Sequence, residues 1–294
     1  MTSFCGIELA HPVINGSGTF DAIAARRVFG DALLAEFPFA AFVSKTITLE
    51  PRPGNPPPRL FETPAGMINS IGLPNKGLRG YLEHDLPELA ELPVPLITNV
   101  MGSAAAEVSA LVEAVGARDE VAAIELNVSC PNVKTGLDIG ADPAVLGAML
   151  AEVRPRTSKP LIVKLTPNTA DVALVAEAAE AAGADAVSLI NTLRAYAAHP
   201  SRPHEPWLGN ATGGLSGPAI RAVALAQVRA VAARVTVPVI GMGGVASARD
   251  AANLLDAGAS LVAVGTASFR DPAIAGQIAR ELAQISAKSG DIVG

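Results

Sequence analysis

The chain has 294 residues, of which 50% are hydrophobic and 17% charged, with a formal net charge of −6 and a sequence pI of about 5.3. This composition supplies one large apolar core, and the acidic balance excludes a surface built to bind a nucleic-acid backbone. Only two cysteines, Cys5 and Cys130, are present, far too few for a disulfide framework or for an iron–sulfur cluster held by this chain alone. No metal site is predicted, so electron transfer would need an organic cofactor.

The N-terminus lacks a basic segment followed by an apolar one, so we expect no signal peptide. Uncharged runs such as 92–106 contain Pro and Gly and are too short for a membrane helix. A cytoplasmic protein is therefore expected.

Short apolar runs alternate with helical stretches along the whole chain. The runs are 12–14, 40–43, 95–97, 121–124, 161–165, 186–190, 238–240 and 261–264. The helices are expected at 22–36, 76–91, 104–115, from Asp142-Pro143 onward, 170–182, 219–234, from Ser247 to 256, and from about Asp271-Pro272. Eight strand-then-helix units predict a parallel (β/α)8 TIM barrel, one domain over residues 1–294. A doubly wound sheet is the alternative, but no G-x-G-x-x-G follows the first strand.

A long Pro- and Gly-rich excursion, at about residues 47–75, interrupts the second unit. It is too long for an ordinary βα loop, which favours a lid or binding loop. The part from Pro51 to Pro58 is equally typical of a surface connection, whereas 69–75 offers amide groups around a glycine.

Polar residues or glycines stand where each predicted strand ends. In a barrel these ends meet at one mouth, so together they predict a lined site. Glycines after the seventh and eighth strands favour phosphate binding through backbone N–H groups, with plain tight turns as the alternative. The residues are Ser17, Lys45, Asn99, Asn127, Lys164, Asn191, Thr192, Gly243, Gly244, Gly265 and Thr266.

Two lysines, Lys45 and Lys164, lie at the ends of buried strands. A buried ammonium costs free energy unless an anion meets it, so a reduced flavin or a substrate carboxylate is expected nearby. Two alternatives stay open. The lysines could reach solvent at the barrel rim, or one could form a Schiff base, as in a barrel lyase.

The loop after the fourth strand carries Cys130, followed by Pro131. A thiol there can act as a general base, whereas the alternative is a small buried cysteine. No histidine dyad is evident, which disfavours covalent catalysis. Four asparagines could face a flat ligand with alternating donors and acceptors, such as a pyrimidine, although each alone is also typical of a turn. They are Asn69, Asn127, Asn132 and Asn191.

Nine motifs, in order and over essentially the whole chain, resemble those of the dihydroorotate dehydrogenases. They are NGSGTF, SKTITLEPRPGNPPPRL, GMINSIGLPN, ELNVSCPNVKTG, LIVKLTPN, LINT, TGGLSGPAI, IGMGGV and AVGTA. The resemblance implies an FMN-bearing barrel that oxidises dihydroorotate to orotate in pyrimidine biosynthesis. A base takes the proton from C5 while a hydride passes from C6 to the flavin.

The resemblance also implies a role for individual residues. Cys130 takes the position of the base. The FMN contacts fall on Ser17, Lys45, Thr46, Asn99, Asn127, Lys164, Ile190, Gly217, Gly243, Gly244, Gly265 and Thr266. The orotate contacts fall on Lys45, Asn69, Ser70, Ile71, Gly72, Leu73, Asn127, Asn191 and Thr192, with Asn132 beside them.

Within the family, a cysteine base and no N-terminal membrane segment resemble class 1, since the quinone-linked membrane class uses serine. Within class 1, ETPAGMIN, Lys134 and LTPN are similar to the NAD-linked class 1B. That class implies a homodimer of this chain, joined in a heterotetramer by a second subunit that carries FAD and a [2Fe-2S] cluster. The fumarate-linked class 1A is the nearest alternative. Two stretches depart from the 1B pattern, Gly136-Leu137-Asp138 and Ala195-Tyr196. The resemblance therefore does not predict the shape of the active-site lid or of the loop after the sixth strand.

Three further functions remain as alternatives. In a flavin enzyme that acts on uracil-type rings, the substrate would have no carboxylate for Lys45 to bind. A Schiff-base lyase would be colourless, and a metabolite-binding barrel without catalysis would not turn over dihydroorotate.

Overall fold

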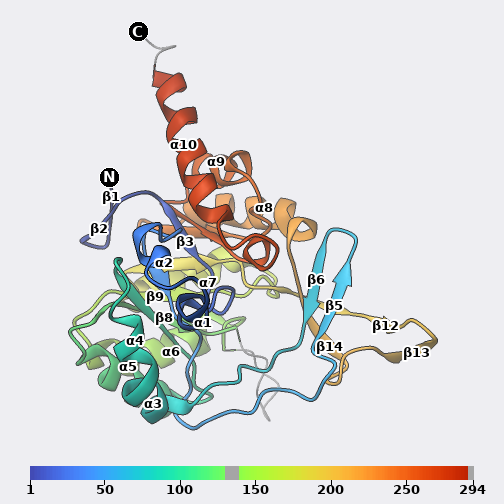
Figure 1. The fold of residues 1–294 in the computed structure, drawn as a ribbon. Coiled ribbons are helices and arrows are strands. Elements are labelled where there is room, and N and C mark those ends of the chain that lie inside the picture. The colour runs from blue at the N-terminus through green and yellow to red at the C-terminus, as the bar shows by residue number, and fades with distance from the viewer. Residues whose placement is uncertain (130–138, 291–294) are drawn as a thin grey trace.

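The computed structural model describes residues 1–129 and 139–290, with side chains to residue 285. Eight parallel strands form a central barrel-like sheet surrounded by helices (Figure 1). The predicted (β/α)8 barrel is confirmed. In chain order the strands are β3 (Val13–Asn15), β4 (Phe42–Val43), β7 (Leu96–Val100), β8 (Val121–Asn127), β9 (Leu161–Lys164), β10 (Ala186–Leu189), β15 (Val239–Met242) and β16 (Leu261–Val264).

Each strand is followed by helical structure, close to where the sequence predicts it. The α-helices are α1 (Ala22–Phe29), α2 (Ala32–Ala35), α3 (Gly77–Gly80), α4 (Leu86–Leu89), α5 (Ala105–Gly116), α6 (Pro143–Val153), α7 (Val172–Ala181), α8 (Arg221–Ala232), α9 (Ala248–Asp256) and α10 (Ile274–Gly290). Shorter turns are the π-helical η1 (Tyr81–Asp85) and the 3-10 helices η2 (Arg154–Arg156), η3 (Pro218–Ile220) and η4 (Thr266–Phe269). Among the described residues, no helix has both the length and the apolar character needed to cross a membrane.

Local signals explain where these helices begin and end. Asp142 precedes Pro143, and its carboxylate accepts from the Ala144 N–H (2.8 Å), an N-terminal cap of α6 as predicted. The helix expected at 22–36 is instead broken at Gly30, which has a φ of +60°. Glycine adopts this conformation readily, so it ends α1, and α2 starts afresh.

The strand order runs β3-β16-β15-β10-β9-β8-β7-β4, so the barrel must close between β3 and β4. Closure depends on the buried side chain of Asn15. Its amide donates to the Val43 carbonyl (2.8 Å) and accepts from the Val43 N–H (2.7 Å). One backbone bond, from Ala40 N–H to the Val13 carbonyl (2.9 Å), completes the seam.

Strand residues alternate between two cores. Ala123, Ile162 and Ala186 belong to a cluster inside the barrel, which Phe4 and Leu9 of the N-terminal hairpin join. That hairpin consists of β1 (Thr2–Phe4) and β2 (Ile7–Leu9). The remaining strand residues pack outward against the helices in a larger cluster. Because side chains two apart share a face, polar residues in step with the inner cluster also point into the barrel.

A second, antiparallel sheet covers part of the barrel mouth at the right of Figure 1. Its strands are β5 (Leu60–Thr63), β6 (Gly66–Asn69), β14 (Thr212–Ser216) and β11 (Leu193–Tyr196), and beyond it lies the hairpin of β12 (Ala198–His199) and β13 (Arg202–Pro206). The excursion near 47–75 thus contains a hairpin that pairs with the segment after β10.

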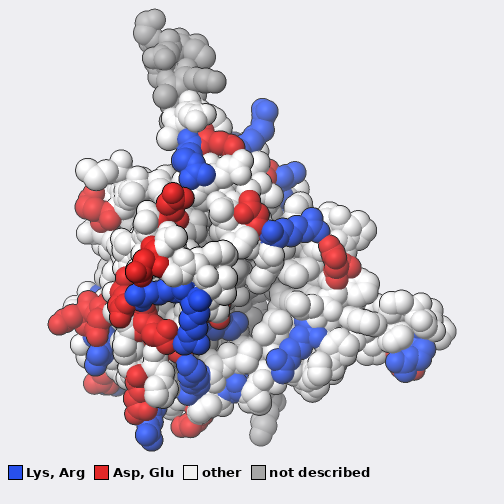
Figure 2. Space-filling model, viewed as in Figure 1, with Lys and Arg blue, Asp and Glu red and all other residues white. Residues whose placement is uncertain are grey.

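Both signs of charge occur on the face drawn in Figure 2. Figure 2 shows acidic and basic side chains side by side at the left of the view. Ion pairs such as Arg27–Glu88 (3.0 Å) lie between exposed side chains there, and pairs of this kind add little stability.

Candidate functional site

The segment after β4 bulges and carries Lys45 to the barrel mouth. The Ser44 N–H donates to the Ile97 carbonyl (2.9 Å), and the Ile47 N–H donates to the Asn99 carbonyl (3.0 Å). Between these two bonds β7 advances by two residues, from Ile97 to Asn99, whereas the segment after β4 advances by three, from Ser44 to Ile47. One extra residue is therefore left in a bulge. Gly18 makes room for the ammonium, because a Cβ there would lie 2.8 Å from Lys45 Nζ.

Lys45 and Lys164 are close enough to affect each other electrostatically. Burial and the neighbouring Lys164 charge together lower the pKa of the Lys45 ammonium. Lys164 itself is only 6% exposed, and within the described residues neither ammonium has an ion pair or hydrogen bond. Two cations held this way favour an anionic ligand.

A buried polar layer lies inside the barrel below the lysines. Glu125, in step with Ala123, accepts hydrogen bonds from the Asn99 amide (2.5 Å) and from the Ser188 hydroxyl (2.7 Å). The Asn99 side-chain oxygen is buried and has no hydrogen-bond partner among the described residues. Sequence reasoning identified Asn99 but missed Glu125 and Ser188, whose link to Asn99 depends on contacts between separate strands.

The predicted phosphate side is built from close backbone approaches. A Cβ on Gly244 would lie 2.9 Å from the Gly217 carbonyl oxygen, and a Cβ on Gly217 would lie 3.5 Å from Thr266 Cγ2. Gly243 and Gly244 have φ values of +126° and +75°. Gly265 is less crowded, with Thr19 Cγ2 at 3.5 Å from its Cβ position. The structure therefore packs Gly217 and Gly244 against each other, at positions where a side chain would not fit.

Ser17 and Thr46 meet across the seam between β3 and β4. The Ser17 hydroxyl donates to the Ser44 carbonyl (2.8 Å) and lies 3.3 Å from the Thr46 hydroxyl. The strand ends of β3 and β4 are thereby joined next to Lys45.

The second sheet brings two predicted pyrimidine-binding segments together. Gly214 of β14 pairs with Asn69 of β6, and a Cβ on it would lie 1.9 Å from Thr192 Oγ1. Asn191 turns back on the same segment, since its side-chain oxygen accepts from the Thr192 N–H (2.8 Å). Gly214 was missed by sequence reasoning, because nothing local in the sequence links it to Asn69 or Thr192.

The tip of the excursion is held from within. Asn55 donates to the buried Ser70 hydroxyl (3.1 Å), and its N–H donates to the Ile71 carbonyl (3.0 Å). Gly72 and Leu73 both have positive φ, +76° and +53°. The tip therefore has a defined turn rather than an extended course.

Of the remaining predicted residues, Asn127 ends β8 and Ile190 follows β10. Asn127 is 9% exposed and its side-chain oxygen accepts from the Ser129 N–H (3.1 Å), while Ile190 is buried. Cys130 and Asn132 lie outside the described residues.

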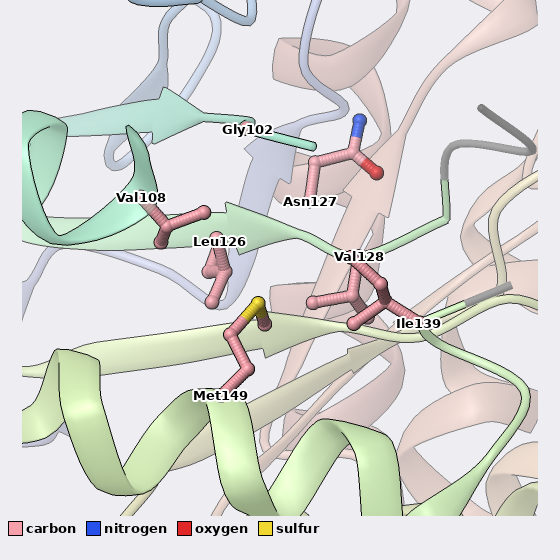
Figure 3. A pocket seen from close by; sticks show the side chains of 7 residues that line it. All are labelled: Gly102, Val108, Leu126, Asn127, Val128, Ile139 and Met149. Atoms are coloured by element: carbon pink, nitrogen blue, oxygen red, sulfur yellow. The ribbon is translucent and has the colours of Figure 1, made fainter. Parts of the chain in front are cut away.

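A small pocket lies on the helix-facing side of β8, lined by Gly102, Val108, Leu126, Asn127, Val128, Ile139 and Met149. In Figure 3 the side chains of Leu126, Val128, Ile139 and Met149 converge, and the Asn127 amide points away from them. This pocket is apolar and lacks both lysines, so it does not suit an anion. The candidate site is instead the barrel mouth.

Comparison with known proteins agrees with this geometry. The sequence model described as dihydroorotate dehydrogenase matches residues 1–285. A protein of Pelobacter propionicus is 46% identical over 279 residues, 95% of this chain and 90% of its own, and one of Citrifermentans bemidjiense is 47% identical over 280 residues, with the same coverage. A Bacillus pumilus protein is 44% identical over 289 residues, 97% of this chain and 91% of its own.

All three relatives are named dihydroorotate dehydrogenase B (NAD(+)), catalytic subunit. The resemblance to the NAD-linked class is confirmed. The chain belongs to the dihydroorotate dehydrogenase family.

Proposed function

We propose that this protein oxidises dihydroorotate to orotate in pyrimidine biosynthesis. Its relatives are named dihydroorotate dehydrogenases, which supports the substrate and the reaction. The observation that carries the proposal is the pair of lysines at the barrel mouth, Lys164 buried and Lys45 half-buried, which has no anionic partner among the described residues. Orotate supplies a carboxylate there, whereas a uracil-type ring does not.

FMN is the proposed cofactor, and the residues present fit it. The orphaned Asn99 oxygen offers an acceptor to a buried donor. The backbone N–H groups of the glycines after β15 and β16 are proposed to donate to the phosphate. The chemistry that FMN supplies when bound is the acceptance of a hydride. The residues proposed to hold it are Ser17, Lys45, Thr46, Asn99, Asn127, Lys164, Ile190, Gly217, Gly243, Gly244, Gly265 and Thr266.

The chain itself supplies the base and the substrate contacts. Cys130, three residues beyond Asn127, is proposed to take the proton from substrate C5 while the hydride leaves C6. Lys45 binds the carboxylate, and the ring is held by Asn69, Ser70, Ile71, Gly72, Leu73, Asn127, Asn132, Asn191 and Thr192. The sheet formed by β5, β6, β14 and β11 carries Asn69 and lies against Thr192.

The assembly is also a proposal. Residues 1–294 form one FMN-binding domain with the excursion at about 47–75 as its insertion. We propose a cytoplasmic homodimer that joins a partner subunit carrying FAD and a [2Fe-2S] cluster in a heterotetramer. The word "subunit" in the relatives' names supports a partner, and NAD is then the final electron acceptor.

Anaerobic mixing of the purified FMN-loaded chain with dihydroorotate tests the reaction. We expect loss of the yellow flavin colour and formation of one orotate per flavin reduced. Addition of NAD with the partner subunit should restore the colour, whereas fumarate should not. A flavin that stays oxidised with dihydroorotate would refute the proposed function.

A further inference from the structure

Glu125 is a buried acid for which the proposed reaction has no direct use. It is 2% exposed and lies on β8 inside the barrel, two residues before Asn127. Each of its oxygens accepts one hydrogen bond, Oε1 from the Ser188 hydroxyl and Oε2 from the Asn99 side-chain nitrogen. A carboxylate in the barrel interior costs free energy, so its retention there calls for a function.

The carboxylate determines which way the Asn99 amide faces. An ionised carboxyl group only accepts hydrogen bonds, so the amide must turn its nitrogen toward Glu125 and its oxygen away. The backbone of Asn99 is also fixed, because its N–H donates to the Ser44 hydroxyl (3.1 Å) and its carbonyl accepts from the Ile47 N–H (3.0 Å). The Asn99 oxygen therefore has one allowed orientation.

That oxygen is the atom left without a partner. Asn99 is fully buried, and its Oδ1 makes no hydrogen bond among the described residues. Leaving a buried acceptor unmet costs about 1–3 kcal/mol, which a donor on a bound ligand would recover. Asn99 stands at the mouth end of β7, beside the bulge that carries Lys45, where such a ligand would lie.

We propose that Glu125 is a positioning residue, which acts through Asn99 to present an amide oxygen to an N–H or O–H donor of the flavin. This inference rests on the proposed function, since it takes FMN as the ligand. A glutamine at position 125 has nearly the same shape but can also donate, so the Asn99 amide could turn over and withdraw its oxygen from the ligand.

Titration of the apoprotein with FMN, followed by flavin fluorescence, tests this directly. Glu125→Gln should weaken FMN binding about tenfold, the loss expected for one misdirected buried hydrogen bond. Ser188→Ala is the matched control, because it removes the other hydrogen bond to Glu125 and leaves the one to Asn99. Its FMN dissociation constant should stay within about threefold of the wild-type value.

A reciprocal exchange separates positioning from a general structural role. Asn99→Asp alone places two carboxylates together and should bind FMN worst. In the double variant Asn99→Asp with Glu125→Gln, the glutamine donates to the aspartate, whose other oxygen is again directed at the ligand. The double variant should bind FMN more tightly than either single variant. If Glu125→Gln alone fails to fold, the comparison of the double variant with Asn99→Asp still tests the role of Glu125.

The outcomes are distinct. Unchanged FMN affinity in folded Glu125→Gln overturns the role of Glu125. A double variant that does not bind FMN more tightly than both folded single variants also overturns it. Lower thermal stability of the Glu125→Gln apoprotein with unchanged FMN affinity also overturns it, because the residue is then only structural. A wild-type chain that binds no FMN refutes the proposed function instead.

Discussion

Gly214 is the residue at which the two predicted pyrimidine-binding segments meet, and replacing it with alanine tests whether their spacing matters. A Cβ at this position would lie 2.5 Å from Thr192 Cβ, below the 3.0 Å limit of real contacts. Rotation of the Thr192 side chain cannot relieve this contact, since Cβ is fixed to the backbone. The backbones of β14 and Thr192 must therefore separate by at least about half an ångström, at a cost of about 1–3 kcal/mol for such overpacking.

The expected result is a loss of substrate affinity without a loss of flavin. Displacements of this order near a reacting group cost up to about a hundredfold, so we expect orotate binding to Gly214→Ala to weaken by about ten- to a hundredfold. Orotate affinity is measured by its perturbation of the flavin spectrum, and FMN affinity by fluorescence. FMN affinity should stay within about twofold, because Gly214 lies in the added sheet rather than in the barrel.

Gly147→Ala is the matched control for this experiment. Gly147 lies within α6, and a Cβ there meets nothing within 4 Å. This substitution should stabilise the helix by about 0.5–1 kcal/mol and leave orotate binding unchanged. Orotate affinity of wild-type strength in folded Gly214→Ala would refute the role assigned to the spacing of Asn69 and Thr192.

Three further predictions concern charge, proton transfer and stability. Burial and Lys164 lower the pKa of Lys45, so the unfolded chain holds more protons on this residue between that lowered pKa and the ordinary value of 10.5. The contribution of Lys45 to stability should therefore rise with pH through this window, measured as the difference between wild type and a Lys45 variant because the raised pKa of Cys5 acts in the opposite direction. Lys45→Met should abolish that rise in pH-dependent unfolding experiments and weaken orotate binding at least about tenfold. Cys130→Ala should keep FMN but slow flavin reduction by dihydroorotate about 10²–10⁴-fold at neutral pH in stopped-flow measurements; an unchanged rate would exclude Cys130 as the base. Asp142→Ala should lower the free energy of unfolding by about 1 kcal/mol in urea titrations through loss of the α6 cap, with FMN affinity unaltered.

The strands and most helices could be predicted because their signals are local. Apolar runs, the Asp142-Pro143 cap and polar strand ends each lie within a few residues. The barrel also determines which residues share the mouth, so Lys45 and Lys164 could be placed together from the sequence. The Lys164 charge lowers the pKa of Lys45, which is consistent with the two ammoniums lying near each other.

What the sequence could not predict depends on contacts between distant segments. Strands of a parallel barrel are buried on both faces, so the apolar run around Glu125 shows no alternation that would distinguish inward from outward side chains. Glu125 becomes interpretable only when Asn99 and Ser188 are seen on the neighbouring strands. Gly214 is likewise separated from Asn69 by 145 residues, and their pairing has no local signature.

The charges at the barrel mouth explain why an acidic protein can bind anions. The chain carries a net charge of −6, and its helical surface mixes both signs (Figure 2), so long-range attraction does not bring an anion to the site. The two lysines act over a short range instead, because burial removes the water that would screen them. Glu125 lies one layer below and is bound to neutral donors rather than to either lysine, which leaves both ammoniums free to meet ligands. The barrel thus keeps Glu125 apart from Lys45 and Lys164. We therefore expect affinity for an anion to depend on these few groups at the mouth rather than on the net charge of the whole molecule.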